Sequence, residues 1–141
     1  MNNLLSRLKI QKGFTLLELL ITLSIIVILT MLAIWVFTSY AKKSRRADAM
    51  NTIMAISLAE ERYRAVNTQY GTLAQVWTGS STPGGYYTVS ISNNTATGYT
   101  ISATAQGGQA SDAENAVSCT TLQLVVSAGT ATKSPTACWP E

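Results

Sequence analysis

The alternation of apolar and polar residues divides the chain into a long apolar run, an amphipathic stretch and several short alternating segments. Residues 14–37 form a run of 24 residues with a single charge, Glu18, and neither glycine nor proline interrupts it. A helix of that length reaches roughly 36 Å, which is enough to cross a hydrocarbon core of about 30 Å. The run therefore predicts a membrane-spanning helix over residues 14–38.

The stretch 39–66 predicts a continuation of the same helix, because its apolar residues recur at spacings of three and four. The members of this stripe are Met50, Ile53, Ile56, Ala59, Tyr63 and Val66. The stripe predicts that the helix docks on a sheet, and Glu60 and Arg64 have the spacing of a solvent-side helical ion pair. A basic cluster, Lys42–Arg46, precedes the stripe, and such charge runs usually face solvent or lipid headgroups.

The second half of the chain predicts a small antiparallel sheet, because apolar and polar residues alternate there with period two. The expected strands are 86–91, 99–103 and 121–127, with a return over 130–133 after a turn. The residues expected on the inner face are Tyr87, Val89, Ile91, Tyr99, Ile101, Ala103, Leu122, Leu124 and Val126. Together with the helix, this sheet predicts an α+β fold.

Two connections complete the predicted fold. The loop over 67–85 is rich in turn residues, and its Tyr70, Leu73 and Trp77 are expected to anchor it to the core. The segment Gln106-Gly107-Gly108-Gln109 predicts a flexible connection between the second and third strands.

Glu18 is the unusual residue of the apolar run. An ionised carboxylate at membrane depth costs several kcal/mol, so Glu18 is a candidate functional residue that needs an oppositely charged partner. Three bases, Arg7, Lys9 and Lys12, precede the run, and Gly13 marks the junction. A secretory signal peptide fits less well, because its apolar region usually has about 7–15 residues and ends at a small-residue cleavage site.

The basic leader, Gly13, Phe14, the two leucines and Glu18 resemble the amino terminus of type IV pilins. The resemblance implies that a prepilin peptidase removes residues 1–13 by cutting between Gly13 and Phe14, and that Phe14 is then N-methylated. It also implies that Glu18 acts in assembly with other pilin subunits. The alternative is a plain signal anchor with an incidental acid.

The remainder of the chain resembles PilE-like minor pilins. The resemblance rests on Ser44-Arg45-Arg46-Ala47-Asp48, Pro83-Gly84-Gly85-Tyr86-Tyr87, Gly98-Tyr99-Thr100-Ile101, Cys119 and Cys138-Trp139. It implies the type IV pilin fold: a long helix packed on a small antiparallel sheet, with a globular head over 67–141.

The resemblance also implies a carboxyl-terminal D-region, residues 119–138, bounded by Cys119 and Cys138. An even cysteine count in an exported domain favours a disulfide between them. Two unrelated thiols are the alternative.

Composition excludes several classes of function. The chain has no histidine, so neither a Ser-His-Asp nor a Cys-His arrangement can form, and we expect no catalytic residues, metal or cofactor. DNA binding is possible but not favoured, because phosphate contacts need a basic surface. From Asn51 onward the bases are Arg62, Arg64 and Lys133, against the acids Glu60, Glu61, Asp112, Glu114 and Glu141.

The sequence therefore predicts a minor structural subunit of a type IV pilus that supports assembly, twitching motility and adhesion. The implied location is the inner membrane of a Gram-negative bacterium, with a periplasmic head, and then the extracellular pilus. The alternatives are a DNA-binding minor pilin for natural transformation and a type II secretion pseudopilin.

Overall fold

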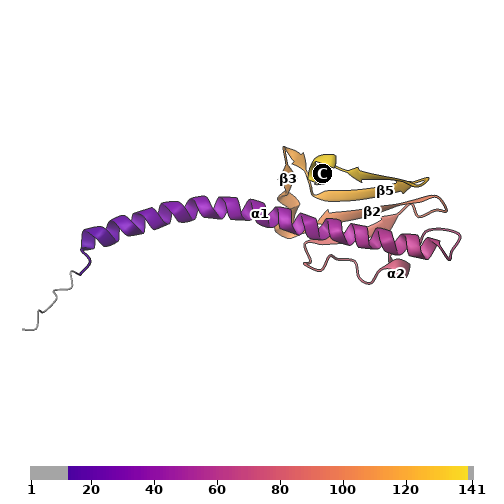
Figure 1. The fold of residues 1–141 in the computed structure, drawn as a ribbon, viewed down its shortest axis with the longest axis horizontal. Helices are drawn as coiled ribbons and strands as arrows, with labels where there is room; N and C mark the ends of the chain where they lie inside the picture. The colour runs from indigo at the N-terminus through magenta and orange to yellow at the C-terminus, as the bar shows by residue number, and fades with distance from the viewer. Residues whose placement is uncertain (1–12, 140–141) are drawn as a thin grey trace, which may run out of the picture. The chain divides into compact units, whose positions relative to one another are not determined.

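The computed structural model describes residues 13–139, apart from the side chain of Trp35. The predicted long helix is confirmed as α1 (Leu16–Arg64), which continues without a break from the apolar run into the amphipathic stretch (Figure 1). Among the described residues, α1 is the one helix that is long and apolar enough to cross a membrane. It is uninterrupted because its sequence contains neither glycine nor proline, the residues that weaken or break helices.

The chain divides into two compact units, Met1–Thr38 and Ser39–Glu141. In the first unit, α1 is the only element of the described residues, and its apolar side chains there are exposed. The second unit contains the remainder of α1 and every strand of the described chain.

A four-stranded antiparallel sheet forms the scaffold of the second unit. Its strands are β1 (Tyr87–Ser92), β2 (Gly98–Ala105), β5 (Thr121–Ser127) and β6 (Thr130–Ser134), in the order β1-β2-β5-β6. The predicted strands and their order along the chain are therefore confirmed. The carboxyl half of α1 covers one face of this sheet (Figure 1).

Short elements occupy the connections. A one-turn helix, α2 (Leu73–Val76), lies in the loop after α1, and a two-stranded ribbon joins β3 (Ala113–Glu114) to β4 (Val117–Ser118). The 3₁₀ helices are η1 (Gly107–Ser111) and η2 (Thr136–Cys138). Leu73 and Trp77 pack against the core and Tyr70 belongs to it, so the predicted loop anchors are confirmed.

The core lies between α1 and the inner face of the sheet. Met50, Ile53 and Ile56 supply the α1 side, and the predicted inner-face residues of the three long strands supply the other. Tyr99 contacts Tyr70 edge-on, with 4.6 Å between ring centroids, which ties the loop after α1 to the second strand.

Three predictions about individual positions are wrong. Val66 lies beyond the end of α1 and is 83% exposed, so the buried stripe ends earlier than the periodicity indicated. Glu60 is buried and binds a backbone amide instead of Arg64. The predicted flexible connection contains the start of η1, with Gln109 fully buried.

Candidate functional site

The start of α1 places the residues of the predicted cleavage and assembly site next to one another. Phe14 is 76% exposed, and α1 begins two residues later at Leu16. The Glu18 amide donates to Thr15 Oγ1 at 3.2 Å, so the Thr15 hydroxyl caps the helix. Glu18 lies in the first turn, where the helix dipole favours a negative charge.

The other polar side chains of the apolar segment are satisfied within the helix. The hydroxyls of Thr22 and Ser24 donate to the carbonyls of Leu19 and Leu20 at 2.9 and 2.8 Å, and Thr30 bonds back to Ile26 in the same way. Side-chain bonds of this kind let a hydroxyl enter lipid without a partner from another chain. Glu18 is thus the residue of this segment whose charge calls for an external partner.

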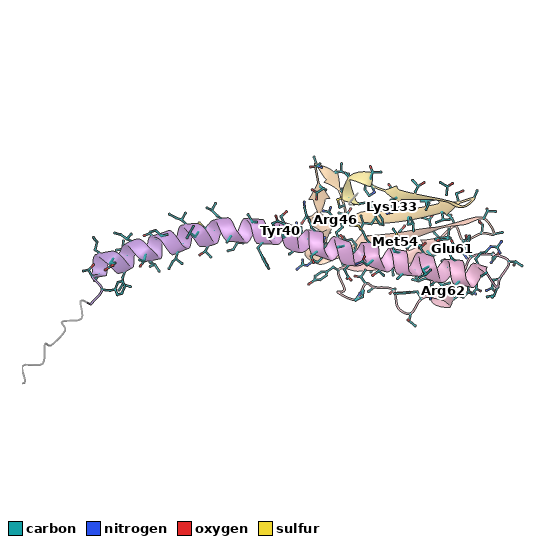
Figure 2. All side chains as sticks on the ribbon, in the orientation of Figure 1. Tyr40, Arg46, Met54, Glu61, Arg62 and Lys133 are labelled. Atoms are coloured by element: carbon teal, nitrogen blue, oxygen red, sulfur yellow. A yellow bond between two sulfur atoms is a disulfide. The ribbon has the colours of Figure 1, made fainter. Side chains whose placement is uncertain are left out.

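The basic cluster is not the solvated or headgroup-facing patch that the sequence indicated. We call Lys42, Lys43, Arg45 and Arg46 the helix collar, because each of these cations contacts a group of the head. Arg46 lies on α1 where the helix meets the β3 end of the head (Figure 2). The collar fastens η1, β3 and the segment before β1 to a single turn of helix.

Arg46 and Asp112 form the centre of the collar, and both are buried, at 4% and 3% exposure. The guanidinium binds Asp112 with two parallel bonds of 2.8 Å, from Nε to Oδ2 and from Nη2 to Oδ1. The hydrogen bonds to the Asp112 carboxylate raise the pKa of Arg46, so the guanidinium keeps its positive charge. A buried pair of this kind is costly to break, because removal of one member leaves the other charge buried without a partner.

Glu114 extends the collar toward the surface. Its two carboxylate oxygens accept from Lys43 Nζ at 3.0 Å and from Arg46 Nη1 at 3.1 Å. Both hydrogen bonds lower the pKa of Glu114, and the bond from Lys43 has the larger effect. Lys43 is about half exposed, so its bond to Glu114 is a surface interaction with little weight for stability.

Gln109 and Lys42 complete the contact between η1 and the helix. The side-chain amide of Gln109 donates to the Lys42 carbonyl at 3.0 Å and to Asp112 Oδ2 at 3.1 Å, and it lies 3.0 Å from the Tyr87 hydroxyl. Lys42 Nζ donates to the Ser111 hydroxyl at 2.8 Å. The sequence indicated a flexible segment here because two glycines precede Gln109, and it contained no signal for the burial of this amide.

Arg45 binds the head through an aromatic ring. Its guanidinium carbon lies 4.0 Å from the centre of the Tyr86 ring, a cation–π contact. Asp48, one turn further along α1, accepts from the Gly84 amide at 3.3 Å. The segment before β1 is therefore held at two points of the helix.

Glu60 is a second buried acid, near the other end of the head. Its Oε2 accepts from the Gly71 amide at 2.7 Å, while Oε1 has no partner among the described residues. Burial raises the pKa of Glu60, and the bond from Gly71 offsets part of this effect. The neighbouring Glu61 accepts from the Tyr70 hydroxyl at 3.1 Å, so both acids hold the loop that follows α1.

Cys119 and Cys138 form the disulfide that bounds the predicted D-region, which excludes the alternative of two unrelated thiols. Both residues are buried in the core, together with Trp139. Lys133 of β6 is paired with the buried Leu124, which places it on the inner side of the strand, and its Nζ lies 5.2 Å from the centre of the Trp139 ring. The bridge closes the segment that contains β5, the edge strand β6 and η2.

Comparison with known protein families gives the class of the chain. Residues 8–34 match the model of the prokaryotic N-terminal methylation motif. That motif, the apolar amino-terminal helix, the antiparallel sheet and the carboxyl-terminal disulfide together define a type IV pilin fold.

The chain belongs to the family described as type IV minor pilin ComP, DNA uptake sequence receptor, whose model matches residues 36–123. No curated protein matches the chain. The chain is therefore a type IV minor pilin, and its methylation motif fits membrane anchoring, prepilin processing and assembly with other pilins. Assignment to the PilE-like subgroup stays a prediction.

The predicted site residues fall into separate groups. Gly13, Phe14 and Glu18 lie together at the start of α1, and the bases of the predicted leader lie outside the described residues. Cys119 and Cys138 are joined in the second unit. The helix collar was not predicted from the sequence. Arg46 and Asp112 are 66 residues apart, and no local pattern indicates that Arg46 meets the acids at 112 and 114.

Proposed function

We propose that this chain is a minor subunit of a type IV pilus that enters the filament through Glu18. Prepilin peptidase cuts between Gly13 and Phe14, and Phe14 is then N-methylated. The observation that carries the proposal is the single carboxylate of Glu18 in the first turn of an exposed apolar helix. In lipid such a charge needs a partner, and the helix itself supplies none.

The partner is the amino group that cleavage creates on Phe14. It is cationic at neutral pH, because an α-amino group has a pKa of about 7.7–8.0. Glu18 of an incoming subunit pairs with the Phe14 amine of a subunit already in the filament. Since one charge meets one charge in a hydrocarbon environment, only one axial register of neighbouring helices satisfies both groups.

The orientation follows from the same proposal. Residues 1–13 lie in the cytoplasm and residues 14–38 span the inner membrane. The head lies in the periplasm of a Gram-negative cell before it reaches the extracellular pilus. It consists of a helical stem over 39–66 and a globular part over 67–141. Counting bases alone leaves this orientation open, because Lys42–Arg46 flanks the far end of the span. Asp112 and Glu114 bind Lys43 and Arg46, so folding of the head reduces the positive charge of that flank.

The assembly role is tested by replacing Glu18 with Ala and with Gln. We expect both variants to be cut normally, with mass spectrometry placing the new amino terminus at Phe14, but to be depleted at least about tenfold from sheared pili. The matched control is Thr15→Ala, which removes the helix cap and keeps the charge. Normal incorporation of Glu18→Gln would refute charge pairing, and depletion of Thr15→Ala alone would point to the cap instead.

A second function, reception of DNA for natural transformation, is favoured by the family match, whose described members are DNA uptake sequence receptors. The match covers 36–123 and thus much of the head. The head offers few free cations for phosphate, since Lys43 and Arg46 bind acids, whereas Arg62 is exposed. DNA reception therefore depends on few ionic contacts.

Deletion of the chain separates the two functions when surface pili, twitching, adhesion and DNA uptake are scored together. If the chain is a structural subunit, pili, twitching, adhesion and DNA uptake should all fall together. If it is a DNA receptor, DNA uptake should fall while pili and twitching remain. Loss of secretion with intact pili would instead indicate a type II secretion pseudopilin.

A further inference from the structure

The sheet face turned away from α1 carries almost no chemistry other than hydroxyl groups. Its outward residues are Thr88, Ser90, Ser92, Thr100, Ser102, Thr104, Thr121, Gln123, Val125, Ser127, Thr130, Thr132 and Ser134. We call these residues the hydroxyl face. All but Gln123 and Val125 bear a hydroxyl, and none bears a charge. The one charged residue of the four strands, Lys133, turns to the inner side and contacts Trp139.

The strand register arranges these hydroxyls in rows across the sheet. Ser90 pairs with Ser102, Ser102 with Gln123, and Gln123 with Ser134, which forms one continuous row of side chains. A parallel row contains Thr88, Thr104 and Thr121. Within a row, neighbouring residues are about 4.8 Å apart, and successive rows are roughly 7 Å apart, so the face is a regular array of donors and acceptors.

Many of these hydroxyls are available to a ligand. Those of Thr100, Thr121 and Thr132 make no bond to another protein group within residues 13–139, whereas Gln123 bonds to Ser102 at 3.2 Å. The surface of a soluble domain normally carries interspersed charges of both signs, which limit its association with other surfaces. The absence of charge over four strands therefore leaves the surface able to meet an uncharged partner.

We propose that the hydroxyl face binds a neutral polysaccharide. A nucleic acid is excluded as its occupant, because the face offers no cation to a phosphate. The four short strands span only about 300–400 Å² in projection, so a second copy of this chain would have to bury side chains beyond the face to reach the accessible area of about 800 Å² that each partner of a stable complex buries. The face also lacks the aromatic and Arg side chains on which protein interfaces depend.

A partner that matches this face would be uncharged, would carry hydroxyls in a repeating array, and would need both hydrogen-bond donors and acceptors from the protein. A polysaccharide chain has this chemistry, and a flat array of Ser and Thr supplies it without desolvating a charge. The proposal goes beyond assembly into the filament and does not depend on it. The hydroxyl face contributes no residue to three cavities of the described head, which are lined by other residues, so it suits an extended chain better than a small enclosed sugar.

The test is co-sedimentation of the full-length chain, in detergent micelles, with microcrystalline cellulose as a neutral probe. The informative variant changes Thr100, Thr121 and Thr132 to Val, which keeps the side-chain shape and removes three hydroxyls. The control makes the same change at exposed threonines outside the face: Thr68, Thr78 and Thr136. We expect the face variant to lose at least about tenfold in bound fraction and the control to lose less than about twofold.

Several outcomes would overturn the proposal. They are no sedimentation of the unchanged chain, equal sedimentation of the face variant and the control, and sedimentation without cellulose, which would show self-association. Retention on immobilised DNA instead of cellulose would also overturn it. Circular dichroism and intact disulfides confirm that each variant is folded, so loss of binding by the face variant is not a failure to fold.

Discussion

Asp112→Asn tests whether the helix collar holds the head together. Asp112 accepts two bonds of 2.8 Å from Arg46 and a third of 3.1 Å from Gln109, and both members of the ion pair are buried. Removing one member of a buried pair costs about 3–5 kcal/mol, because the other charge remains without water or partner. Arg46 keeps its bond to Glu114, so we expect the low end, about 3 kcal/mol.

That loss is large beside the total stability of a domain of this size, which is about 5–15 kcal/mol. The assay is urea unfolding of the full chain in detergent micelles, with the disulfide intact, followed by the fluorescence of tryptophans that include buried Trp139. The matched control is Lys43→Ala, which breaks a half-exposed pair and should cost less than about 1 kcal/mol.

The double variant Arg46→Met with Asp112→Leu extends the test. Replacing a buried ion pair by apolar residues of similar size is often neutral or stabilising, so the double variant should be more stable than Asp112→Asn alone. The reasoning is refuted if Asp112→Asn costs no more than Lys43→Ala, or if the double variant unfolds more easily than the single one.

Three further predictions follow from the head. Burial raises the pKa of Glu60, so the folded form keeps a proton that the unfolded chain releases above about pH 4.3, and stability falls as pH rises through the folded pKa. Glu60→Gln should therefore raise the Tm at pH 7 more than at pH 4, and an equal change at both pH values would contradict this assignment. Gly98→Ala would place a Cβ 2.3 Å from a β5 carbonyl oxygen and should lower the free energy of unfolding by about 1–3 kcal/mol. The control is Gly108→Ala, which should cost far less, because a Cβ at Gly108 meets nothing within 4 Å. Equal urea midpoints for the two variants would show that the strand accommodates the methyl group. Replacing Cys119 and Cys138 by Ser should cost about 3 kcal/mol in thermal unfolding, and an unchanged Tm would show that packing alone holds this segment.

The sequence predicted the elements of this fold because their signals are local. Alternation with period two placed β1, β2 and β5, and the buried Met50, Ile53 and Ile56 followed the helical period. The disulfide was predicted because the two cysteines occur in a chain that resembles an exported protein.

What the sequence did not predict depends on contacts between distant residues. A charged residue is expected at the surface on statistical grounds, so burial of Arg46 required a partner that lies 66 residues away. Glu60 and Arg64 have the spacing of a helical pair, yet the Gly71 amide is the group that Glu60 binds. In each case an interaction across the fold replaced the one that local spacing favoured.

The position of β6 determines which part of the head can change most freely. This five-residue strand lies at the edge of the sheet, all of its residues are exposed, and it pairs with β5 alone. The bridge to Cys138 fastens the chain just beyond it. Substitutions at the exposed threonines and alanine of β6 thus leave the packing of the helix on the other strands intact, and related subunits can diversify there at small cost to folding.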